Sequence, residues 1–338
     1  MAQALTTTSF CDSCKLDTRL LNEHYCVAFI KKNVGLFRNK VVLDLGCRSG
    51  YLTIYAIEYG QVEKVFVWGV GAMTNMASYF EALLGKEKEK RILQLEGALD
   101  DIILPGGHPR VDIILSEWIG SCVFGDSLFK ELIYARDNWL VPGGIIIPNL
   151  ANLYIAGISY NPIPAKSNIS QVEFSNEEQH CTLLEEQVKK EQLMTEEFLV
   201  NSVNMHTAKV SDIDFEAEFK LKPLRDGQFN AFAVFYNVGF IDANGRTDIL
   251  FSTSPKAIKT NMEQVILLTE KTEIKRKMTI TGYFGIKPNE MEYRGVELSV
   301  RLSDGEDKAD DDVEIIEQEG NENDVIVLDE DDDDDDDD

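Results

Sequence analysis

The sequence has no long hydrophobic run, few cysteines and a shortage of basic residues. No apolar stretch reaches the length of about 18 residues that a transmembrane helix needs, so we expect no membrane span. Residues 1–10 lack a basic region followed by an apolar segment, so we expect no signal peptide. Six cysteines among 338 residues are too few for a disulfide scaffold. A reducing, cytoplasmic location is therefore expected, with the nucleus left open.

The shortage of basic residues is concentrated in one segment. The whole chain carries a net charge of −26. Residues 304–338 hold 21 acidic residues and one lysine, which leaves a net charge of −6 for residues 1–303. Like charges at this density repel one another, so we predict a disordered acidic tail on an ordinary globular body. The composition gives no support for nucleic-acid binding, since a domain of that kind usually shows a basic face.

The first half of the body alternates between strand and helix patterns. An amphipathic helix is predicted at 12–33, within an N-terminal segment 1–35. Short apolar strands are then predicted at 41–45, 64–70, 91–95, 111–115 and 144–148. Helices are predicted between them at 51–59, 72–84 and 126–140. This alternation favours an α/β fold with a doubly wound, mostly parallel sheet over residues 36–150.

The second half of the body, residues 151–303, changes to a period of two. Apolar and polar residues alternate at 213–222, 229–240, 275–286 and 294–302. Val296, Leu298 and Val300 lie on one face of such a strand, and Glu297 and Ser299 on the other. The pattern predicts antiparallel, half-buried strands in a barrel or a sandwich. Residues 161–197 form a polar, partly helical insertion, and the tail begins near residue 304.

Several motifs follow one another in a fixed order. They are the glycine turn 42–50 (VLDLGCRSG), Leu115-Ser116-Glu117-Trp118-Ile119-Gly120, Asp126-Ser127-Leu128, residues 134–140 (YARDNWL) and residues 251–255 (FSTSP). Together they resemble the type I protein arginine methyltransferases, and the resemblance covers roughly residues 10–303. It implies an S-adenosylmethionine-type Rossmann domain, followed by an antiparallel β-barrel with a helical dimerisation arm at about 161–197.

The resemblance also assigns the cofactor positions, and two of them depart from the family pattern. They are Asp44, Gly46, Arg48, Gly50, Gly69, Leu99 and Asp100. Arg48 stands where the family has a small residue that lets the cofactor approach the backbone. Gly69 stands where the family has a carboxylate that holds the ribose hydroxyls. We therefore expect this chain to bind no cofactor, with S-adenosylmethionine bound in a partner subunit.

The catalytic positions are altered as well. In the family two glutamates bind the planar guanidinium of the substrate. Glu117 matches the first, and Asp126 matches the second with one methylene less, so we treat them as a vestigial pair. A tyrosine-containing segment of the family aligns with residues 10–14, and an arginine aligns with Cys26. A histidine and a tryptophan are missing from Thr260-Asn261-Met262.

An intact framework with an altered site resembles the catalytically inactive "prozyme" subunit found in kinetoplastids. We therefore predict a non-catalytic subunit that binds and stabilises or activates an active protein arginine methyltransferase. The resemblance implies Arg/Gly-rich proteins as substrates of that heteromer. One alternative is a divergent active methyltransferase that uses Glu117 and Asp126. A second alternative is a module that binds basic proteins through the acidic tail.

Two further patterns have two interpretations each. Cys11, Cys14, His24 and Cys26 have the residue types of a zinc site, but reduced packed thiols fit their irregular spacing better, so no metal is predicted. Val325, Ile326, Val327 and Leu328 lie beside acidic residues in the tail. They resemble a motif that adds a strand to a small ubiquitin-like modifier, and the alternative is a solubilising tail.

Overall fold

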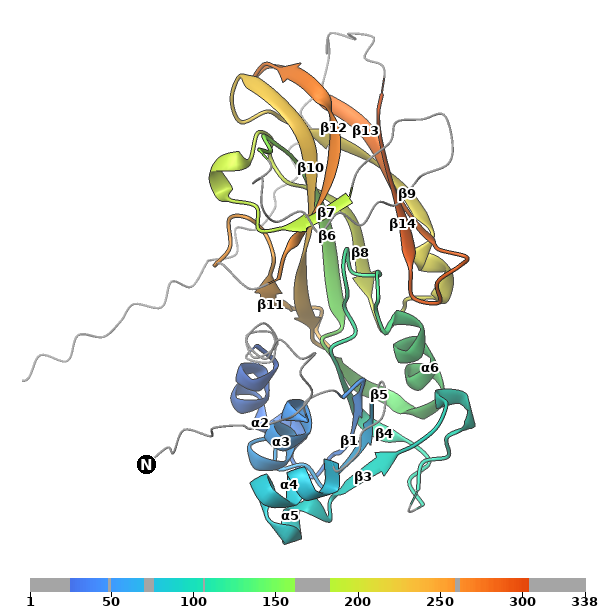
Figure 1. Ribbon diagram of the computed structural model, residues 1–338. Helices are drawn as coiled ribbons and strands as arrows, with labels where there is room; N and C mark the ends of the chain where they lie inside the picture. The colour runs from blue at the N-terminus through green and yellow to red at the C-terminus, as the bar shows by residue number, and fades with distance from the viewer. Residues whose placement is uncertain are drawn as a thin grey trace, which may run out of the picture. The chain divides into compact units, whose positions relative to one another are not determined.

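The computed structural model describes residues 25–47, 50–69, 76–105, 107–161, 183–258 and 262–303 (Figure 1). Residues 1–303 form one compact unit, and residues 304–338 form a second unit that lies outside the described residues. The predicted N-terminal helix is described from residue 25 onward. Residues 25–32 are helical, and α2 (Val34–Phe37) follows after a turn at Asn33.

The first half of the body contains a five-stranded sheet in the order β3-β2-β1-β4-β5. Its strands are β1 (Val41–Leu45), β2 (Lys64–Trp68), β3 (Ile92–Leu95), β4 (Val111–Ser116) and β5 (Leu140–Ile147). All four strand pairs are parallel. The predicted doubly wound parallel sheet is thus confirmed, and the carboxyl ends of its strands lie along one edge.

Helices cover both faces of this sheet, which explains why its strands are mostly apolar. On β1, Leu43 belongs to the core that contains α6 (Phe129–Trp139), whereas Val42 belongs to the core that contains α3 (Tyr51–Glu58) and α4 (Met76–Leu84). The short α5 (Lys86–Glu89) follows α4 and has no buried residue. Of the described helices, none is long and apolar enough to span a membrane.

Two antiparallel sheets make up the second half and form a barrel-like body. The larger has the order β7-β12-β10-β6-β8, with β11 also paired to β10, and the smaller has the order β14-β13-β9. The larger sheet consists of β6 (Leu150–Ile158), β7 (Leu183–Glu186), β8 (Phe198–Asn204), β10 (Gly227–Ile241), β11 (Thr247–Ser252) and β12 (Gln264–Ile274). The smaller consists of β9 (Phe215–Leu221), β13 (Ile280–Pro288) and β14 (Val296–Leu302). Phe219 of β9 and Phe232 of β10 join the two sheets, with ring centroids 5.7 Å apart.

Two predicted segments differ from the structure. Residues 275–279 form an exposed turn and not the start of a strand, because the Met278 N–H closes back onto the Lys275 carbonyl oxygen at 2.9 Å. The polar insertion 161–197 was predicted to be partly helical. Its described part contains β7, which pairs with β12, and only one turn of 3₁₀-helix, η2 (Lys190–Gln192). Residues 162–182 lie outside the described residues.

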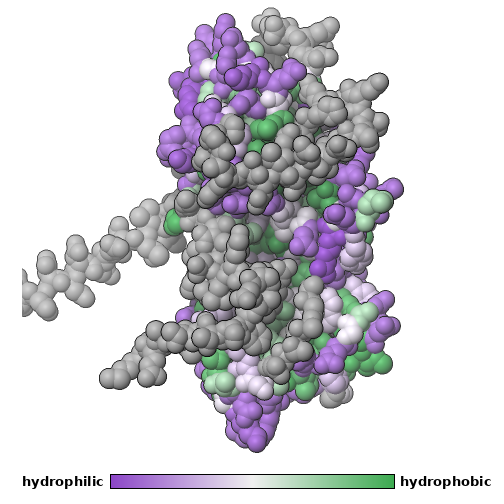
Figure 2. Space-filling model, in the orientation of Figure 1, coloured by the Kyte–Doolittle hydropathy of each residue, from purple (hydrophilic) through white to green (hydrophobic). Residues whose placement is uncertain are grey.

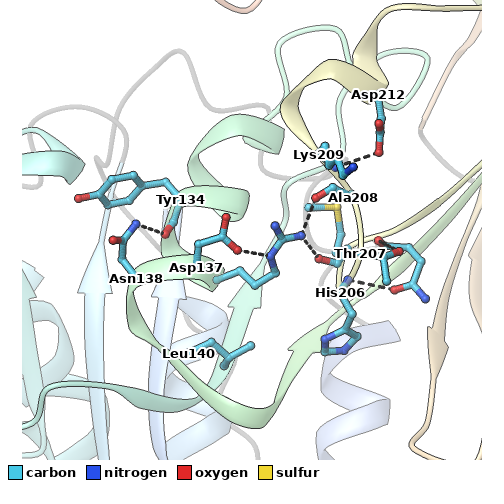
Figure 3. A network of polar contacts seen from close by, with 12 residues as sticks. Tyr134, Asp137, Asn138, Leu140, His206, Thr207, Ala208, Lys209 and Asp212 are labelled. Carbon is cyan, nitrogen blue, oxygen red and sulfur yellow. Dashed lines mark hydrogen bonds and ion pairs between the residues drawn. The ribbon is translucent and has the colours of Figure 1, made fainter.

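Arg136 of α6 connects the two halves of the body. Figure 3 shows Asp137 of α6 near the segment that contains His206 and Ala208. Its Nη1 donates to the carbonyl oxygens of Met205 and Ala208, at 2.8 and 2.7 Å, in the segment between β8 and η3 (Val210–Ile213). Its Nε donates to Asp137 at 2.7 Å. Burial lowers the pKa of nearby His206, and the positive charge of Arg136 lowers it further. This contact fixes the parallel sheet against the barrel-like body.

Candidate functional site

The glycine turn after β1 is tightly packed by its neighbours. Gly46 and Gly50 have positive φ angles of 86° and 76°. A Cβ at Gly46 would clash with the side chain of Leu128, so only glycine fits there. The N–H groups of Gly46 and Cys47 both donate to the Trp68 carbonyl oxygen, at 2.8 and 3.0 Å. These two backbone donors are therefore already paired within the protein.

Asp44 lies beneath this turn and is almost completely buried. The Thr53 hydroxyl of α3 donates to its carboxylate at 2.6 Å. Burial raises the pKa of Asp44 to about 6, although hydrogen bonds from Thr53 and Cys47 act in the opposite direction. Asp44 thus braces the turn from inside the fold and titrates close to neutral pH.

The end of β2 has no polar side chain to offer a ligand. Gly69 follows Trp68 and has no side chain that accepts a hydrogen bond. The Trp68 indole is buried, and its Nε1 donates to the Gly97 carbonyl oxygen at 3.2 Å, which links the ends of β2 and β3. Beyond β3, η1 (Leu99–Asp101) buries Leu99 and leaves Asp100 exposed. Of the predicted cofactor positions past the glycine turn, only Asp100 retains a charged side chain.

The loop after β4, residues 117–128, is here called the acceptor loop. It is folded back on itself, with paired N–H and carbonyl groups between Gly120 and Val123. Cys122, Val123 and Asp126 have positive φ angles of 49°, 74° and 49°. Such angles are costly for residues other than glycine, and they are frequent at functional loops. Trp118 anchors the base of the loop, because its buried indole donates to the Pro148 carbonyl oxygen at 3.0 Å.

Glu117 begins the acceptor loop and is half-buried. Burial raises the pKa of Tyr25 well above its ordinary value, and Glu117 is among the neighbours that add to the rise. Tyr25 stacks on Phe251, with ring centroids 5.4 Å apart. Burial also raises the pKa of Tyr236, again with a contribution from Glu117. The first predicted carboxylate therefore lies among tyrosines from the N-terminal helix and from β10.

Asp126, the second predicted carboxylate, has a different setting. Its side chain is exposed, and its backbone N–H donates to the Arg294 carbonyl oxygen at 2.8 Å. Arg294 lies in the connection between β13 and β14, and its guanidinium pairs with the buried Glu131 of α6. The backbone of Asp126 is thus fixed from the barrel-like body. Its role in a carboxylate pair with Glu117 stays a prediction.

Glu185 of β7 is a third carboxylate at this loop, and the sequence patterns did not single it out. It accepts a hydrogen bond of 2.7 Å from the Ser121 hydroxyl. Burial raises the pKa of Cys122 and of Tyr236, and Glu185 adds to both rises. Glu117 and Glu185 thus both interact electrostatically with Tyr236. The prediction of a partly helical segment at 161–197 did not indicate this contact. Glu185 lies beside the loop because β7 pairs with β12.

Several predicted positions fall outside the described residues. They are residues 10–14, Arg48, Thr260, Asn261 and the tail motif Val325, Ile326, Val327 and Leu328. Three members of the alternative zinc site, Cys11, Cys14 and His24, are also outside. Its fourth member, Cys26, belongs to the N-terminal helix and is completely buried in the core. Met262 is described and packs against the barrel core, while its carbonyl oxygen accepts a hydrogen bond from Gln187 Nε2.

Comparison of the sequence with known families and proteins gives a consistent result. Residues 149–306 match the model described as the arginine methyltransferase oligomerization subdomain. The chain is 31% identical to protein arginine N-methyltransferase 1 of Caenorhabditis elegans over 80% of its own length and 79% of that protein's length. It is 29% identical to protein arginine N-methyltransferase 1 of Saccharomyces cerevisiae over 81% of its own length and 79% of that protein's.

The fold gives the same result. The Trypanosoma brucei PRMT1 enzyme-prozyme heterotetrameric complex with AdoHcy contains a chain that matches with a TM-score of 0.70 and 25% identity. The match covers 82% of this chain and 88% of that one. Arabidopsis thaliana protein arginine methyltransferase 10 shares the fold, with a TM-score of 0.69, 22% identity and coverages of 85% and 90%. On these grounds the chain belongs to the protein arginine methyltransferase family.

Proposed function

We propose that this chain is a methyltransferase-fold subunit with little or no catalysis of its own, which binds an active protein arginine methyltransferase and stabilises or activates it. The observation that carries the proposal is the end of β2. Gly69 occupies the position that the family resemblance assigns to a ribose-binding carboxylate, and the neighbouring Trp68 indole is bonded to Gly97. A bound ribose would find no side-chain acceptor at Gly69.

The residues around this position do not fit S-adenosylmethionine. The N–H groups of Gly46 and Cys47 are paired with Trp68, and of the predicted cofactor positions beyond the glycine turn only Asp100 has a charged side chain. Hydrogen bonds to a charged group contribute about 1.5–3 kcal/mol each, so the loss of a carboxylate with two hydroxyl partners weakens binding strongly. The sequence adds Arg48 inside the same turn. We therefore assign cofactor binding to the partner subunit.

Assembly with a relative is supported by the barrel-like half of the body. It is this half, residues 149–306, that matches the oligomerization subdomain of the family. The similar chain from Trypanosoma brucei belongs to an enzyme-prozyme heterotetramer. By extension, we propose that the heteromer formed by this chain methylates Arg/Gly-rich proteins and that its cofactor is bound in the active subunit.

Calorimetric titration of the purified full chain with S-adenosylmethionine tests the proposal. We expect no measurable heat of binding. Replacing both altered positions, Arg48→Gly with Gly69→Glu, should restore detectable affinity. Arg48→Gly with Gly69→Gln is the matched control, because it adds the same bulk without the charge. The charged variant should bind about 10–100-fold more tightly than this control. Micromolar binding by the unmodified chain overturns the proposal.

A second experiment tests the partnership. The full chain is co-expressed with an active family member from the same organism, and the purified complex is weighed by native mass spectrometry. We expect a complex containing both chains, with a higher turnover on an Arg/Gly-rich peptide than the active member shows alone. Two separate homo-oligomers with unchanged turnover would count against a regulatory role.

The second candidate function is a divergent active arginine N-methyltransferase. The acceptor loop favours it, because the carboxyl groups of Glu117 and Glu185 both contribute to the raised pKa of Tyr236, whose main cause is burial. The similar proteins from Caenorhabditis elegans and Saccharomyces cerevisiae also favour it, since both are protein arginine N-methyltransferases. Turnover of an Arg/Gly-rich peptide by the purified chain alone, abolished in Glu117→Gln, would establish this function. If neither the unmodified chain nor Glu117→Gln shows turnover, the result supports the non-catalytic subunit.

A further inference from the structure

Ser303 is the last described residue, and the composition of the sequence changes directly after it. Residues 304–338 contain no serine, threonine or tyrosine, and the four residues after Ser303 are Asp304, Gly305, Glu306 and Asp307. A protein kinase with a basic substrate groove selects a serine that is followed by acidic residues, because the charges are complementary. Since the acidic segment has no hydroxyl of its own, Ser303 is the nearest acceptor that such a kinase can use.

The backbone of Ser303 continues β14, the end strand of the smaller sheet. Leu302 pairs with Gly282, and the Ser303 N–H donates to the Thr281 carbonyl oxygen at 2.9 Å. Successive side chains of a strand lie on opposite faces of its sheet. Arg301, two residues earlier, is exposed on the outer face. Ser303 therefore lies on that same outer face, and it is partly exposed.

A lysine lies in the same row across the smaller sheet, whose strands β14, β13 and β9 are neighbours (Figure 1). Thr281 of β13 lies between the two residues, because it accepts from Ser303 on one side and pairs with Lys220 of β9 on the other. Neighbouring strands are about 4.8 Å apart, so the backbones of Ser303 and Lys220 are about 10 Å apart. Both side chains are on the outer face, and a phosphate on Ser303 can meet the Lys220 ammonium above the small Thr281.

Lys220 is available for such a contact. Among the residues that the structure describes, it forms no ion pair. The nearby Arg301 already pairs with Glu216 at 2.9 Å and lies over the Tyr283 ring, 4.0 Å from its centroid. Further exposed basic side chains lie at this end of the sheet, which is mainly hydrophilic at the top of Figure 2: Lys222, Lys275, Arg276 and Lys277. Their positive charge favours a phosphate at Ser303.

We propose that Ser303 is a phosphorylation site and that Lys220 binds the resulting phosphate. The γ-phosphoryl group of ATP is transferred to the Ser303 oxygen. Its bond to the bridging oxygen of ADP breaks, the O–P bond of phosphoserine forms, and the hydroxyl proton passes to a base of the kinase. The new group carries a charge of about −1.5 to −2, so its contact with Lys220 ties β14 to β9 across β13. The site goes beyond the proposed subunit function, because neither the acceptor loop nor a cofactor position takes part.

The modification is tested on the purified full chain with ATP, Mg²⁺ and a serine kinase that prefers acidic residues after the serine. Peptide mass spectrometry then locates the phosphate. We expect phosphate on Ser303 and its complete loss in Ser303→Ala. Ser299→Ala is the matched control, because Ser299 is exposed on the same face of β14 but is followed by no acidic residue. This control should keep the phosphate on Ser303.

Ser211 provides an internal comparison. It is followed by Asp212 and Asp214, but it lies in η3, where the Asp212 carboxylate accepts the Lys209 N–H at 2.9 Å. The folded turn should make Ser211 a poorer substrate than Ser303. Phosphate on Ser211 without phosphate on Ser303, or no phosphate on the chain at all, overturns the proposal.

The contact with Lys220 is tested by ³¹P NMR titration of the phosphorylated full chain. A neighbouring cation lowers the second pKa of phosphoserine, because it favours the doubly charged form. Lys220→Gln should therefore raise the midpoint of this titration, by about 0.5 pH units. Lys287→Gln is the matched control, since it removes an exposed lysine near the other end of β13, and it should leave the midpoint unchanged. An unchanged midpoint in Lys220→Gln, or equal changes in both variants, overturns the contact.

Discussion

Two regions on the same edge of the parallel sheet, the ends of β1 and β2 and the acceptor loop after β4, differ in the side chains that they present. At the ends of β1 and β2, where the family resemblance predicts a cofactor site, Gly69 has no side chain and the Trp68 indole is bonded to Gly97. The acceptor loop after β4 has carboxyl side chains, Glu117 within it and Glu185 across it. The two regions share one scaffold, so folding alone does not account for the difference. The difference therefore lies in the side chains and not in the backbone that carries them.

The acceptor loop depends on its anchor, and the largest effect is expected there. Trp118→Ala removes a completely buried indole and leaves the Pro148 carbonyl oxygen without its donor. We expect the free energy of unfolding to fall by about 3–5 kcal/mol, measured by denaturant unfolding. Trp118→Phe keeps most of the packing and should lose less. A loss below about 1 kcal/mol for the alanine variant would show that the loop is not anchored here.

Beneath the glycine turn, Asp44 should make stability depend on pH. Burial raises its pKa in the folded state to about 6, above the ordinary value near 4, so the folded state binds more protons between these values. The free energy of unfolding should therefore fall by about 2 kcal/mol from this group as pH rises from 4 to 6, within a total of about 3 kcal/mol over the whole titration. In Asp44→Asn that part of the pH dependence should disappear.

A variant of the carboxylate's partner checks the same prediction. Thr53→Val removes a hydrogen bond that favours the charged form of Asp44. The pKa of Asp44 should rise further, and the loss of stability should extend to higher pH. Unchanged pH profiles in both variants would mean that another group controls stability in this range.

The acceptor loop is also held from the barrel-like body, with a smaller expected effect. Arg294→Met leaves the buried carboxylate of Glu131 without its cation. Because the Arg294 side chain is partly exposed, we expect a loss of about 2 kcal/mol, less than for a fully buried pair. The double variant Glu131→Met/Arg294→Met should recover most of it. If the double variant is as unstable as the single one, apolar packing and not charge accounts for the contact.

The sequence predicted most of the fold because hydrophobic period is a local property. Each strand of the parallel sheet was located, since covered strands such as β1 and β4 are mostly apolar and buried. The turn at 275–279 was missed because alternation continues through Lys275 and Lys277, and only the closing Met278–Lys275 hydrogen bond ends it. The placement of Glu185 was not predictable either. It depends on pairing between β7 and β12, which are far apart in the sequence.

The smallest effect is expected at Asp126, and it has the opposite sign. Its φ angle of 49° is strained for a residue with a Cβ, and its side chain is exposed. Asp126→Gly should therefore raise the free energy of unfolding by about 1 kcal/mol, while Asp126→Asn should change it little, because asparagine tolerates this conformation. If the carboxylate serves guanidinium binding, both variants should weaken binding of an Arg/Gly-rich peptide, although only one gains stability. Unchanged peptide affinity in both would show that the Asp126 carboxylate does not bind the guanidinium.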